Sequence, residues 1–369
     1  MAPRVTTTLL AAALAVAGCT HGRDAGDAGD AEPASGTVEL AEGEVGASVP
    51  FAWGNTVRGA GERGDPVELG APISSVLVGT LAPAVVPDAA GARLLYNAWR
   101  GDRPVIRVHE LTTGRDEELD DGAAAGIWRA DGALAYFKAD APVFDDPARY
   151  RGHVVVRGPE SESALWTAEQ DRYVVAAWAR QRLLAYRIGE GWPDLLVLDG
   201  PQRVRVLARE SALVALSPDG RRALVFRRGT RPVVVSLLDL ATGEEVAAAR
   251  LPDEVEWLLE SGSWTGEHAV ASGSPGLVVL RVDGDAVELE QVLRFEAGLF
   301  RVGLHEPQVG EDGRVVAWGE YHARPGQVVE QAALVACDRL TLRCVHGPGM
   351  SVAGGPRLVY NPSRPLSGR

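Results

Sequence analysis

The sequence predicts an all-β protein built as a β-propeller of four-stranded antiparallel blades, and three observations lead to this prediction. Beyond residue 38 no long stretch has the apolar periodicity of a helix. Short apolar runs alternate instead with turns that contain glycine. Equivalent turns recur every 39 to 49 residues. A period in the forties with four strands per repeat is typical of propeller blades.

The clearest repeat covers residues 211–250. Its short apolar runs are separated by the turn Ser217–Gly220, a loop through Gly229 and the turn Asp239–Gly243. Pro-Asp-Gly and Thr-Gly sequences favour close reversals of the chain. We therefore expect four short strands that form one antiparallel meander.

Seven such turns favour seven blades, the last of them built from both ends of the chain. Residues 357–360 resemble an inner strand without outer partners, which residues 39–80, including Pro50–Trp53 and Ser74–Val78, can supply. A closed ring leaves the sheet no free edges at the junction. Six blades with an N-terminal hairpin, or a two-sheet sandwich, are the alternatives. The seven turns lie near Asp88, Asp131, Arg180, Asp219, Thr265, Asp312 and Gly354.

The two turns of the clearest repeat also carry a family resemblance. Ser-Pro-Asp-Gly-Arg at 217–221, followed by Asp-Leu-Ala-Thr-Gly-Glu at 239–244, resembles the repeats of TolB-like, WD40-like propellers. The resemblance extends over most of residues 80–350, although the Trp-Asp ending of WD40 repeats is absent. It implies a rigid platform for protein interactions. Residues 20–80 show no separate α/β domain, which is a departure from TolB.

The N-terminus has the layout of a bacterial lipoprotein signal peptide, predicted at residues 1–18. Arg4 precedes an apolar stretch at Leu9–Ala17, which is too short to span a bilayer. Val16–Cys19 resembles a lipobox, in which Cys19 is lipidated and becomes the first mature residue. Acyl chains on this cysteine would hold the protein stably at a membrane. An ordinary cleaved signal with an incidental cysteine is the alternative.

The remaining chain divides into a tether at residues 19–38 and a propeller domain at 39–369. The tether is rich in Gly, Ala and Asp, so it buries too little apolar surface to fold. We expect a monomer in the bacterial cell envelope, facing the periplasm or the cell surface. By analogy with enteric bacteria, Thr20 after Cys19 favours the outer membrane. The formal net charge of −13 argues against nucleic-acid binding.

Two further cysteines, Cys337 and Cys344, flank a predicted turn between two strands. Six intervening residues can place them opposite one another across a hairpin, at disulfide distance if the pair is not hydrogen-bonded. An exported protein meets an oxidising compartment. We therefore predict a structural disulfide.

The sequence shows no recognisable catalytic, metal or cofactor motif. No Gly-x-Ser-x-Gly element occurs, none of the seven histidines has zinc-ligand spacing, and no Gly-rich phosphate loop is present. His268, His305 and His322 could still converge from neighbouring blades. The acidic run at 116–121 reads as a solvated outer strand. These observations favour a non-enzymatic protein without a cofactor.

Two inter-strand loops are the candidate contact surface for an envelope protein partner. One contains Phe144, Arg149 and Tyr150, and the equivalent loop several blades later contains Tyr321 and His322. Long propeller loops open on one face of the ring, where partners bind. The sequence thus predicts a lipid-anchored interaction platform. The alternatives are a lyase or hydrolase acting on an envelope polysaccharide or lactone, and a small-ligand sensor.

Overall fold

The computed structural model describes most of the chain from Ala34 to Val359, and in this part it contains strands and turns only. The part that it describes has 32 strands and no helix, so it holds no helix that could cross a membrane. Residues 1–33 and 360–369 lie outside the described residues. So do internal stretches at 44, 46–49, 59–64, 75–80, 82, 102, 141–150, 160–162, 190, 259–261, 275, 296–299, 310–313, 322–330, 340, 348–349 and 352–356.

Four consecutive sheets are regular four-stranded meanders, each with the strand order of the chain. We number the blades in this order. Blade 1 contains β6 (Val85–Pro87), β7 (Arg93–Arg100), β8 (Arg103–Glu110) and β9 (Asp116–Asp121). Blade 2 contains β10 (Ala123–Trp128), β11 (Leu134–Ala139), β12 (Gly152–Arg157) and β13 (Ser163–Leu165). Blade 3 contains β14 (Tyr173–Ala179), β15 (Arg182–Arg187), β16 (Asp194–Leu198) and β17 (Val204–Ala208). Blade 4 contains β18 (Ser211–Leu216), β19 (Arg222–Arg227), β20 (Val234–Asp239) and β21 (Glu245–Arg250).

The next two sheets keep this plan with additions. Blade 5 contains β22 (Trp257–Leu258), β23 (Ser263–Thr265), β24 (His268–Ser274), β25 (Gly276–Asp283) and β26 (Ala286–Arg294), and both β22 and β23 pair with β24. Blade 6 contains β27 (Phe300–Val309), β28 (Arg314–Tyr321), β29 (Gln331–Asp338) and β30 (Arg343–His346), and β31 (Met350–Ser351) pairs with β29.

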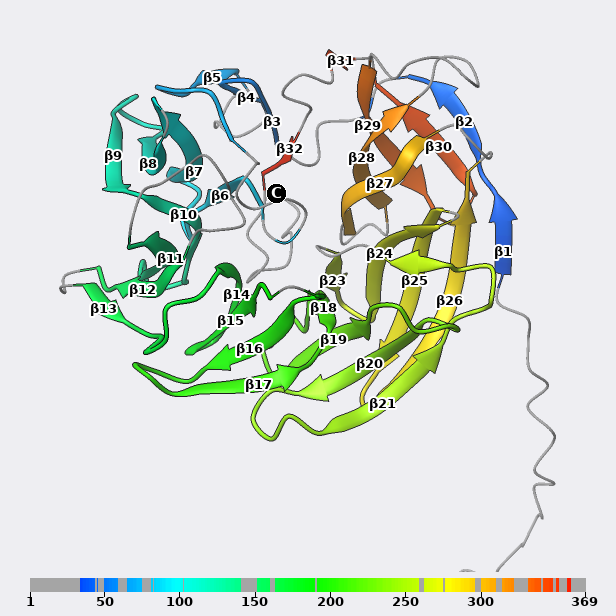
Figure 1. Ribbon diagram of the computed structural model, residues 1–369. Coiled ribbons are helices and arrows are strands. Elements are labelled where there is room, and N and C mark those ends of the chain that lie inside the picture. The colour runs from blue at the N-terminus through cyan, green and yellow to red at the C-terminus, as the bar shows by residue number, and fades with distance from the viewer. Residues whose placement is uncertain are drawn as a thin grey trace, which may run out of the picture. The chain divides into compact units, whose positions relative to one another are not determined.

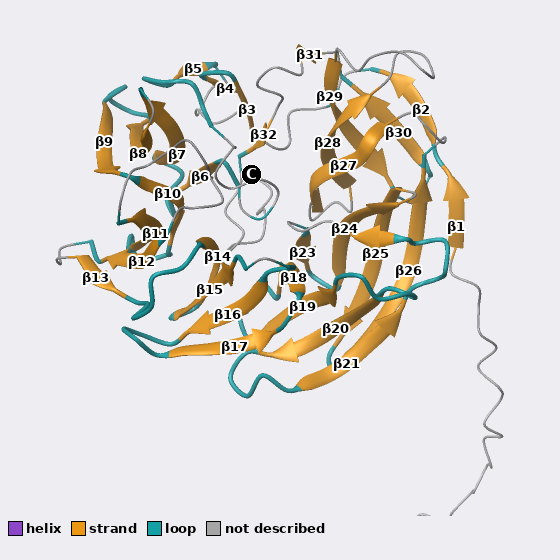
Figure 2. Cartoon of the chain, in the orientation of Figure 1, coloured by secondary structure: helices purple, strands orange, loops and turns teal. Residues whose placement is uncertain are grey.

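Both ends of the chain build blade 7, as the sequence predicted. Strand β32 (Arg357–Leu358) pairs with β3 (Phe51–Trp53), which continues into β4 (Thr56–Arg58) and β5 (Val67–Glu68). Figure 1 shows the seven sheets around a common centre, and Figure 2 shows that strands and loops alone make up this body. The prediction of a seven-bladed propeller is confirmed.

The N-terminal segment adds one outer strand to each of blades 5 and 6 before it enters blade 7, so that each of these sheets has six strands. Strand β1 (Ala34–Thr37) pairs in parallel with β26, and β2 (Glu39–Glu42) pairs in parallel with β30. The tether predicted at 19–38 is therefore wrong in its last residues, since Ala34 already belongs to a sheet. Backbone hydrogen bonds hold this polar segment at the sheet edge, and hydrophobic patterning does not reveal them.

Burial falls from the centre of the ring to its rim. The inner strands β10, β14 and β18 are buried along their whole length, whereas the outer strand β21 is mostly exposed. An inner strand packs on both faces, so its sequence is a continuous apolar run rather than an alternating one. Space there is short: a Cβ on Gly126 would approach Leu95 Cδ2 to 2.6 Å.

Buried side chains connect successive blades where the inner strands are irregular. The Ala125 N–H donates to Asn97 Oδ1 (3.0 Å), and the Leu213 N–H donates to the Tyr186 hydroxyl (2.8 Å). In each pair the strand that donates the backbone N–H shifts its register at or next to the donor residue. A bulge removes a partner from the sheet, and the preceding blade supplies a new one.

Candidate interaction surface

Antiparallel blades present two faces with different connections. Turns from the first to the second strand and from the third to the fourth lie on one face, which we call the turn face. Loops from the second to the third strand, and the links between blades, lie on the opposite loop face. The segment with Phe144, Arg149 and Tyr150 joins β11 to β12, and the segment from Tyr321 to His322 leaves β28 toward β29. Both are second-to-third connections and thus topologically equivalent.

The predicted site residues themselves are only partly described. Residues 141–150, His322 and Cys19 lie outside the described residues. Tyr321 is described only as the backbone end of β28. The role of these residues therefore stays a prediction. The turn predicted near Gly354 also lies outside the described part. The other predicted turns follow the inner strand of their blade, whereas this position precedes the inner strand β32.

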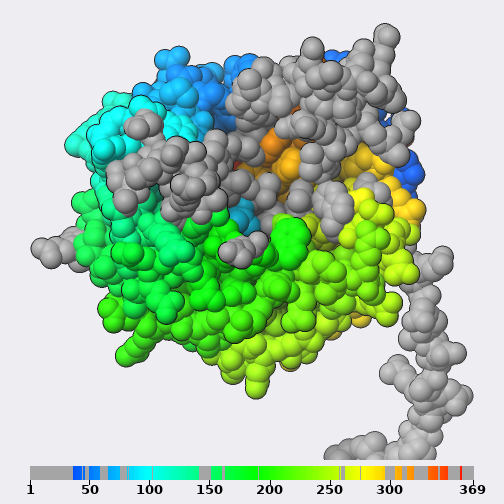
Figure 3. Space-filling view, in the orientation of Figure 1, coloured from blue at the N-terminus to red at the C-terminus, as the bar shows by residue number. Residues whose placement is uncertain are grey.

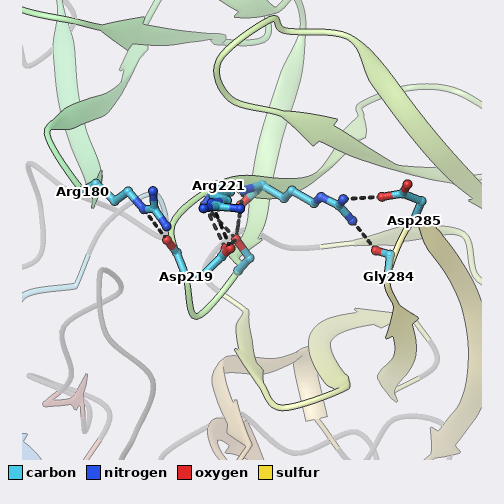
Figure 4. A network of polar contacts seen from close by, with 7 residues as sticks. Arg180, Asp219, Arg221, Gly284 and Asp285 are labelled. Carbon is cyan, nitrogen blue, oxygen red and sulfur yellow. Dashed lines mark hydrogen bonds and ion pairs between the residues drawn. The ribbon is translucent and has the colours of Figure 1, made fainter. Parts of the chain in front are cut away.

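The turn face is occupied by contacts between neighbouring blades. In the Ser-Pro-Asp-Gly turn, Arg180 Nε from blade 3 donates to the Asp219 carbonyl oxygen at 2.7 Å (Figure 4). From the next strand, Arg222 reaches Gly284 and Asp285 of blade 5. The Ser217 hydroxyl donates to the Asp219 carboxylate at 2.7 Å. The motif that carried the family resemblance is therefore used for turn geometry and blade-to-blade contacts.

The carboxylate of Asp219 is fixed by this turn. Partial burial alone would raise the pKa of Asp219, but hydrogen bonds from Ser217 and the Arg221 N–H outweigh it and hold the pKa below its ordinary value. Asp219 thus remains an acceptor that shapes the turn.

Arginine–tryptophan stacks add to the turn face. The Arg93 guanidinium lies 4.7 Å from the ring centroid of Trp128, and that of Arg129 lies 4.8 Å from Trp178. Asp131 holds Arg129 with two contacts of 2.8 and 2.7 Å. Both tryptophans are buried, so they belong to the core between blades.

The loop face carries an exposed tryptophan. Trp192 lies in the connection from β15 to β16, next to Gly191, and is 51% exposed. The Arg228 guanidinium, from the connection between β19 and β20, lies 4.5 Å from its ring centroid. Burial lowers the pKa of the Arg228 guanidinium from its ordinary value. Because the ordinary pKa of arginine is far above 7, the group keeps its charge at neutral pH.

Three segments from blades 3 and 4 build this surface. The Ser211 N–H donates to the Pro193 carbonyl (3.0 Å), and the Arg228 N–H donates to the Glu210 carbonyl (2.9 Å). The two hydrogen bonds hold the connections at 188–193, 209–210 and 228–233 side by side. We define the Trp192 patch as Trp192, the three arginines on these segments and the arginine that ends β19: Trp192, Arg209, Arg228, Arg231 and Arg227.

The Trp192 patch is basic on an acidic protein. Arg209 and Arg227 are exposed, and within the described residues neither side chain has an ion-pair partner. Arg231, with its side chain 73% exposed, has only a 3.9 Å contact to Glu256. The nearby Asp194 is already paired with Arg187 at 2.8 Å. The patch can therefore offer cationic donors beside an exposed aromatic ring. The described residues of blades 3 and 4 form one continuous surface in the space-filling view (Figure 3).

Two of the three histidines that could converge from neighbouring blades have partners of their own. His268 Nδ1 lies 2.8 Å from the Glu290 carboxylate, and Arg339 contacts both His268 and Glu290. His305 stacks on Trp318 with ring centroids 4.5 Å apart. Among the described residues, no group of three or more His, Cys, Asp or Glu side chains could hold a metal ion.

The acidic run at 116–121 forms the outer strand β9, as predicted, but its five carboxylates are ion-paired. Their partners come from β7, β8, β11 and the β8–β9 turn, and they are Arg100, Arg103, Arg107, His109, Arg115 and Lys138. The strand lies at the edge of its sheet and its residues are partly exposed, as expected, and the ion pairs add to this description. The many arginines of blade 1 complement the run, and sequence alone did not show which strands would lie beside it.

Asp116 is the most connected of these carboxylates. It accepts hydrogen bonds from the Gly70 N–H (3.0 Å), the Tyr96 hydroxyl (2.8 Å) and Arg107 Nε (2.7 Å), and His109 Nδ1 lies at 3.1 Å. Burial alone would raise the pKa of Asp116, but these hydrogen bonds outweigh it and place the pKa below its ordinary value.

The predicted disulfide is present. Cys337 and Cys344 lie directly opposite one another on β29 and β30, with a Cα–Cα distance of 4.0 Å. Both are buried. The short distance fits the closely spaced, non-hydrogen-bonded pairs of an antiparallel ladder, as the spacing predicted.

Comparison with known proteins supports the fold. No family model and no curated protein matches the chain. A prolyl endopeptidase structure is similar at 14% identity, with a TM-score of 0.54 over 86% of this chain and 51% of that one. The β-propeller domain of Cps50 (Swd1) from Myceliophteria thermophila is similar at 13% identity, with a TM-score of 0.51 over 75% of this chain and 96% of that domain. TolB from Acinetobacter baumannii is similar at 13% identity, with a TM-score of 0.40 over 66% of each chain.

The two similarities with TM-scores above 0.5 support the β-propeller fold and nothing finer. This chain corresponds to about half of the prolyl endopeptidase, so that enzyme's activity does not transfer.

The Trp192 patch was not singled out from the sequence. A signal was available: Trp192 stands in the Gly-rich segment Ile188–Pro193, where a large aromatic residue has no strand to bury it.

Proposed function

We propose that this protein is a lipid-anchored platform of the bacterial cell envelope, on which a partner protein binds to the loop face. The observation that carries the proposal is the Trp192 patch. A tryptophan exposed to 51% beside stacked and exposed arginines has the composition of an interaction hot spot. On the turn face, in contrast, Arg93, Arg129, Arg180 and Arg222 make contacts between blades.

The envelope location is supported by the N-terminal sequence. Residues 1–18 have the features of a lipoprotein signal and Cys19 stands at the lipobox position. The chain from Thr20 to Pro33 would then link the lipid to β1 at the rim of blade 5. A Gly- and Asp-rich linker of this length spans about 20 Å on average, so the propeller would stay close to its membrane. The outer membrane is the proposed destination.

A crosslinked pull-down from the native cells tests the platform. Wild type should recover one partner in near-stoichiometric amount, and Trp192→Ala should reduce the recovery at least about tenfold, because the central aromatic anchor is lost. Leu165→Ala is the matched control, since Leu165 is also 51% exposed but lies on the outer strand β13. Equal recovery with both variants would refute the proposed surface.

The anchor is tested separately. Cys19→Ser should release the protein from the membrane fraction, and mass spectrometry of the wild-type N-terminal peptide should show acyl chains on Cys19. A soluble wild-type protein, or an unmodified Cys19, would refute the lipid anchor and leave the loop-face proposal to its own test.

A further inference from the structure

We infer that the Trp192 patch recognises an extended, acidic peptide segment of its partner, in which carboxylates flank an apolar or prolyl side chain. This inference rests on the proposed function and specifies the class of ligand for the same surface. The charges and positions of the described side chains carry it.

Charge is the first argument. The protein has a formal net charge of −13, yet the described loop-face segments of blades 3 and 4 carry the exposed Arg209, Arg227 and Arg231 against one exposed carboxylate, Glu210. The ion pair of Asp194 with Arg187 removes one nearby carboxylate from competition. Guanidinium groups bind carboxylates with two parallel hydrogen bonds, so a carboxylate-rich segment is the complementary ligand. The overall negative charge disfavours a long polyanion such as nucleic acid.

The aromatic ring is the second argument. The Arg228 guanidinium packs against the Trp192 ring, 4.5 Å from its centroid, and about half of the tryptophan stays exposed. A partner residue with a flat or compact apolar side chain can pack on the exposed part of the ring. Pre-positioning of the ring reduces the entropy that binding would otherwise cost.

The shape of the patch is the third argument. Its residues come from three connections held side by side by backbone hydrogen bonds, at 188–193, 209–210 and 228–233, and from Arg227 at the end of β19. The patch therefore extends over the loop face of two blades. A surface of this extent suits an extended segment with charges on both sides of an apolar residue, and a compact anion would use only part of it.

Selection from a random nonapeptide library displayed on phage tests the inference on the intact mature chain. Wild type should enrich sequences with Asp or Glu on both sides of an apolar or prolyl residue. Synthetic peptides of these sequences should bind with an affinity that falls at least about tenfold for Trp192→Ala and for the double variant Arg227→Glu/Arg231→Glu. Binding should weaken with added salt, because exposed charges are screened.

Two matched controls define the outcome. Leu165→Ala and Arg203→Glu, the latter on the β16–β17 turn of the turn face, should leave the affinity within about twofold. Selected peptides that depend on Trp192 but carry no acidic residues would overturn the inference and leave the platform standing. The inference would be overturned if no peptide were enriched. It would also be overturned if the affinity of the selected peptides were unchanged by both Trp192→Ala and the charge reversal. If, in addition, Trp192→Ala left the pull-down unaffected, the proposed function would be overturned as well.

Discussion

Glu306 is a buried carboxylate at the seam where the ring closes. It is 4% exposed and lies on β27, where its backbone φ of +49° interrupts the regular strand. Its Oε2 accepts hydrogen bonds from Trp318 Nε1 at 3.0 Å and from the Leu358 N–H at 2.9 Å. One side chain of blade 6 therefore binds the short C-terminal strand that completes blade 7.

Replacement of Glu306 should weaken this closure. Glu306→Ala leaves two buried donors without their acceptor, and we expect a loss of about 2–4 kcal/mol in the free energy of unfolding. Glu306→Gln keeps one acceptor oxygen and should lose less. Urea unfolding measures both variants, with Glu267→Ala as a control within about 0.5 kcal/mol, because Glu267 is exposed and makes only a 3.7 Å contact. An unchanged stability of Glu306→Ala would contradict this role.

Asp116 gives a pH-dependent prediction at the same scale. Its pKa is lower in the folded protein than the ordinary 3.8, so folding favours its charged form. The stabilisation is complete above pH 4–5 and disappears as the pH falls through the lowered folded pKa. Asp116→Asn should therefore cost about 1.5–3 kcal/mol at pH 7, with a smaller deficit at pH 3. Urea unfolding between pH 3 and 8 checks this, and a deficit that is equal or larger at pH 3 would refute it.

Among the elements, the hairpin of β29 and β30 combines a disulfide with a docked turn. Cys337–Cys344 closes the hairpin, and Arg339 in its turn contacts Glu290 of blade 5 at 2.6 Å. Strand β2 pairs along β30, with Leu40 opposite Cys344. The hairpin thus connects blade 6 to blade 5 and to the N-terminal segment.

Removal of the disulfide should destabilise the protein moderately. Cys337→Ala/Cys344→Ala opens a short loop, and we expect a loss of about 2–3 kcal/mol in the free energy of unfolding. Reductant should lower the wild-type stability by a similar amount and leave the double variant unaffected. Denaturant unfolding with and without reductant measures this. A double variant as stable as the oxidised wild type would show that the bond contributes nothing.

The elements differ in how far sequence could predict them. The β18–β19 turn carries Ser-Pro-Asp-Gly, which determines its geometry locally, so it was identified directly. Strands β1 and β2 were missed because their parallel pairing uses the backbone of small and polar residues. The Trp192 patch was missed for a related reason, since its arginines come from connections whose proximity only the blade order determines.

At the scale of the whole molecule, the ring could be predicted because its turns recur at a regular spacing along the sequence. Its closure could be predicted because the inner strand expected at 357–360 needed partner strands. The use of its two faces was not predictable. Only the assembled blades show that the turn face holds arginines in contacts between blades while the loop face of blades 3 and 4 presents Trp192. The proposed binding surface therefore spans two blades, and no single repeat contains it.

Oxidative footprinting of side chains tests this assignment most directly. The protein is labelled with hydroxyl radicals in its native envelope and again after purification, and Trp192 and Leu165 are compared, because both are 51% exposed in the isolated chain. We predict that oxidation of Trp192 is several-fold lower in the envelope than after purification, because a bound partner would bury its ring as it buries other hot-spot residues. Oxidation of Leu165 should be the same in both samples. Equal labelling of Trp192 in both samples would contradict a partner on the loop face.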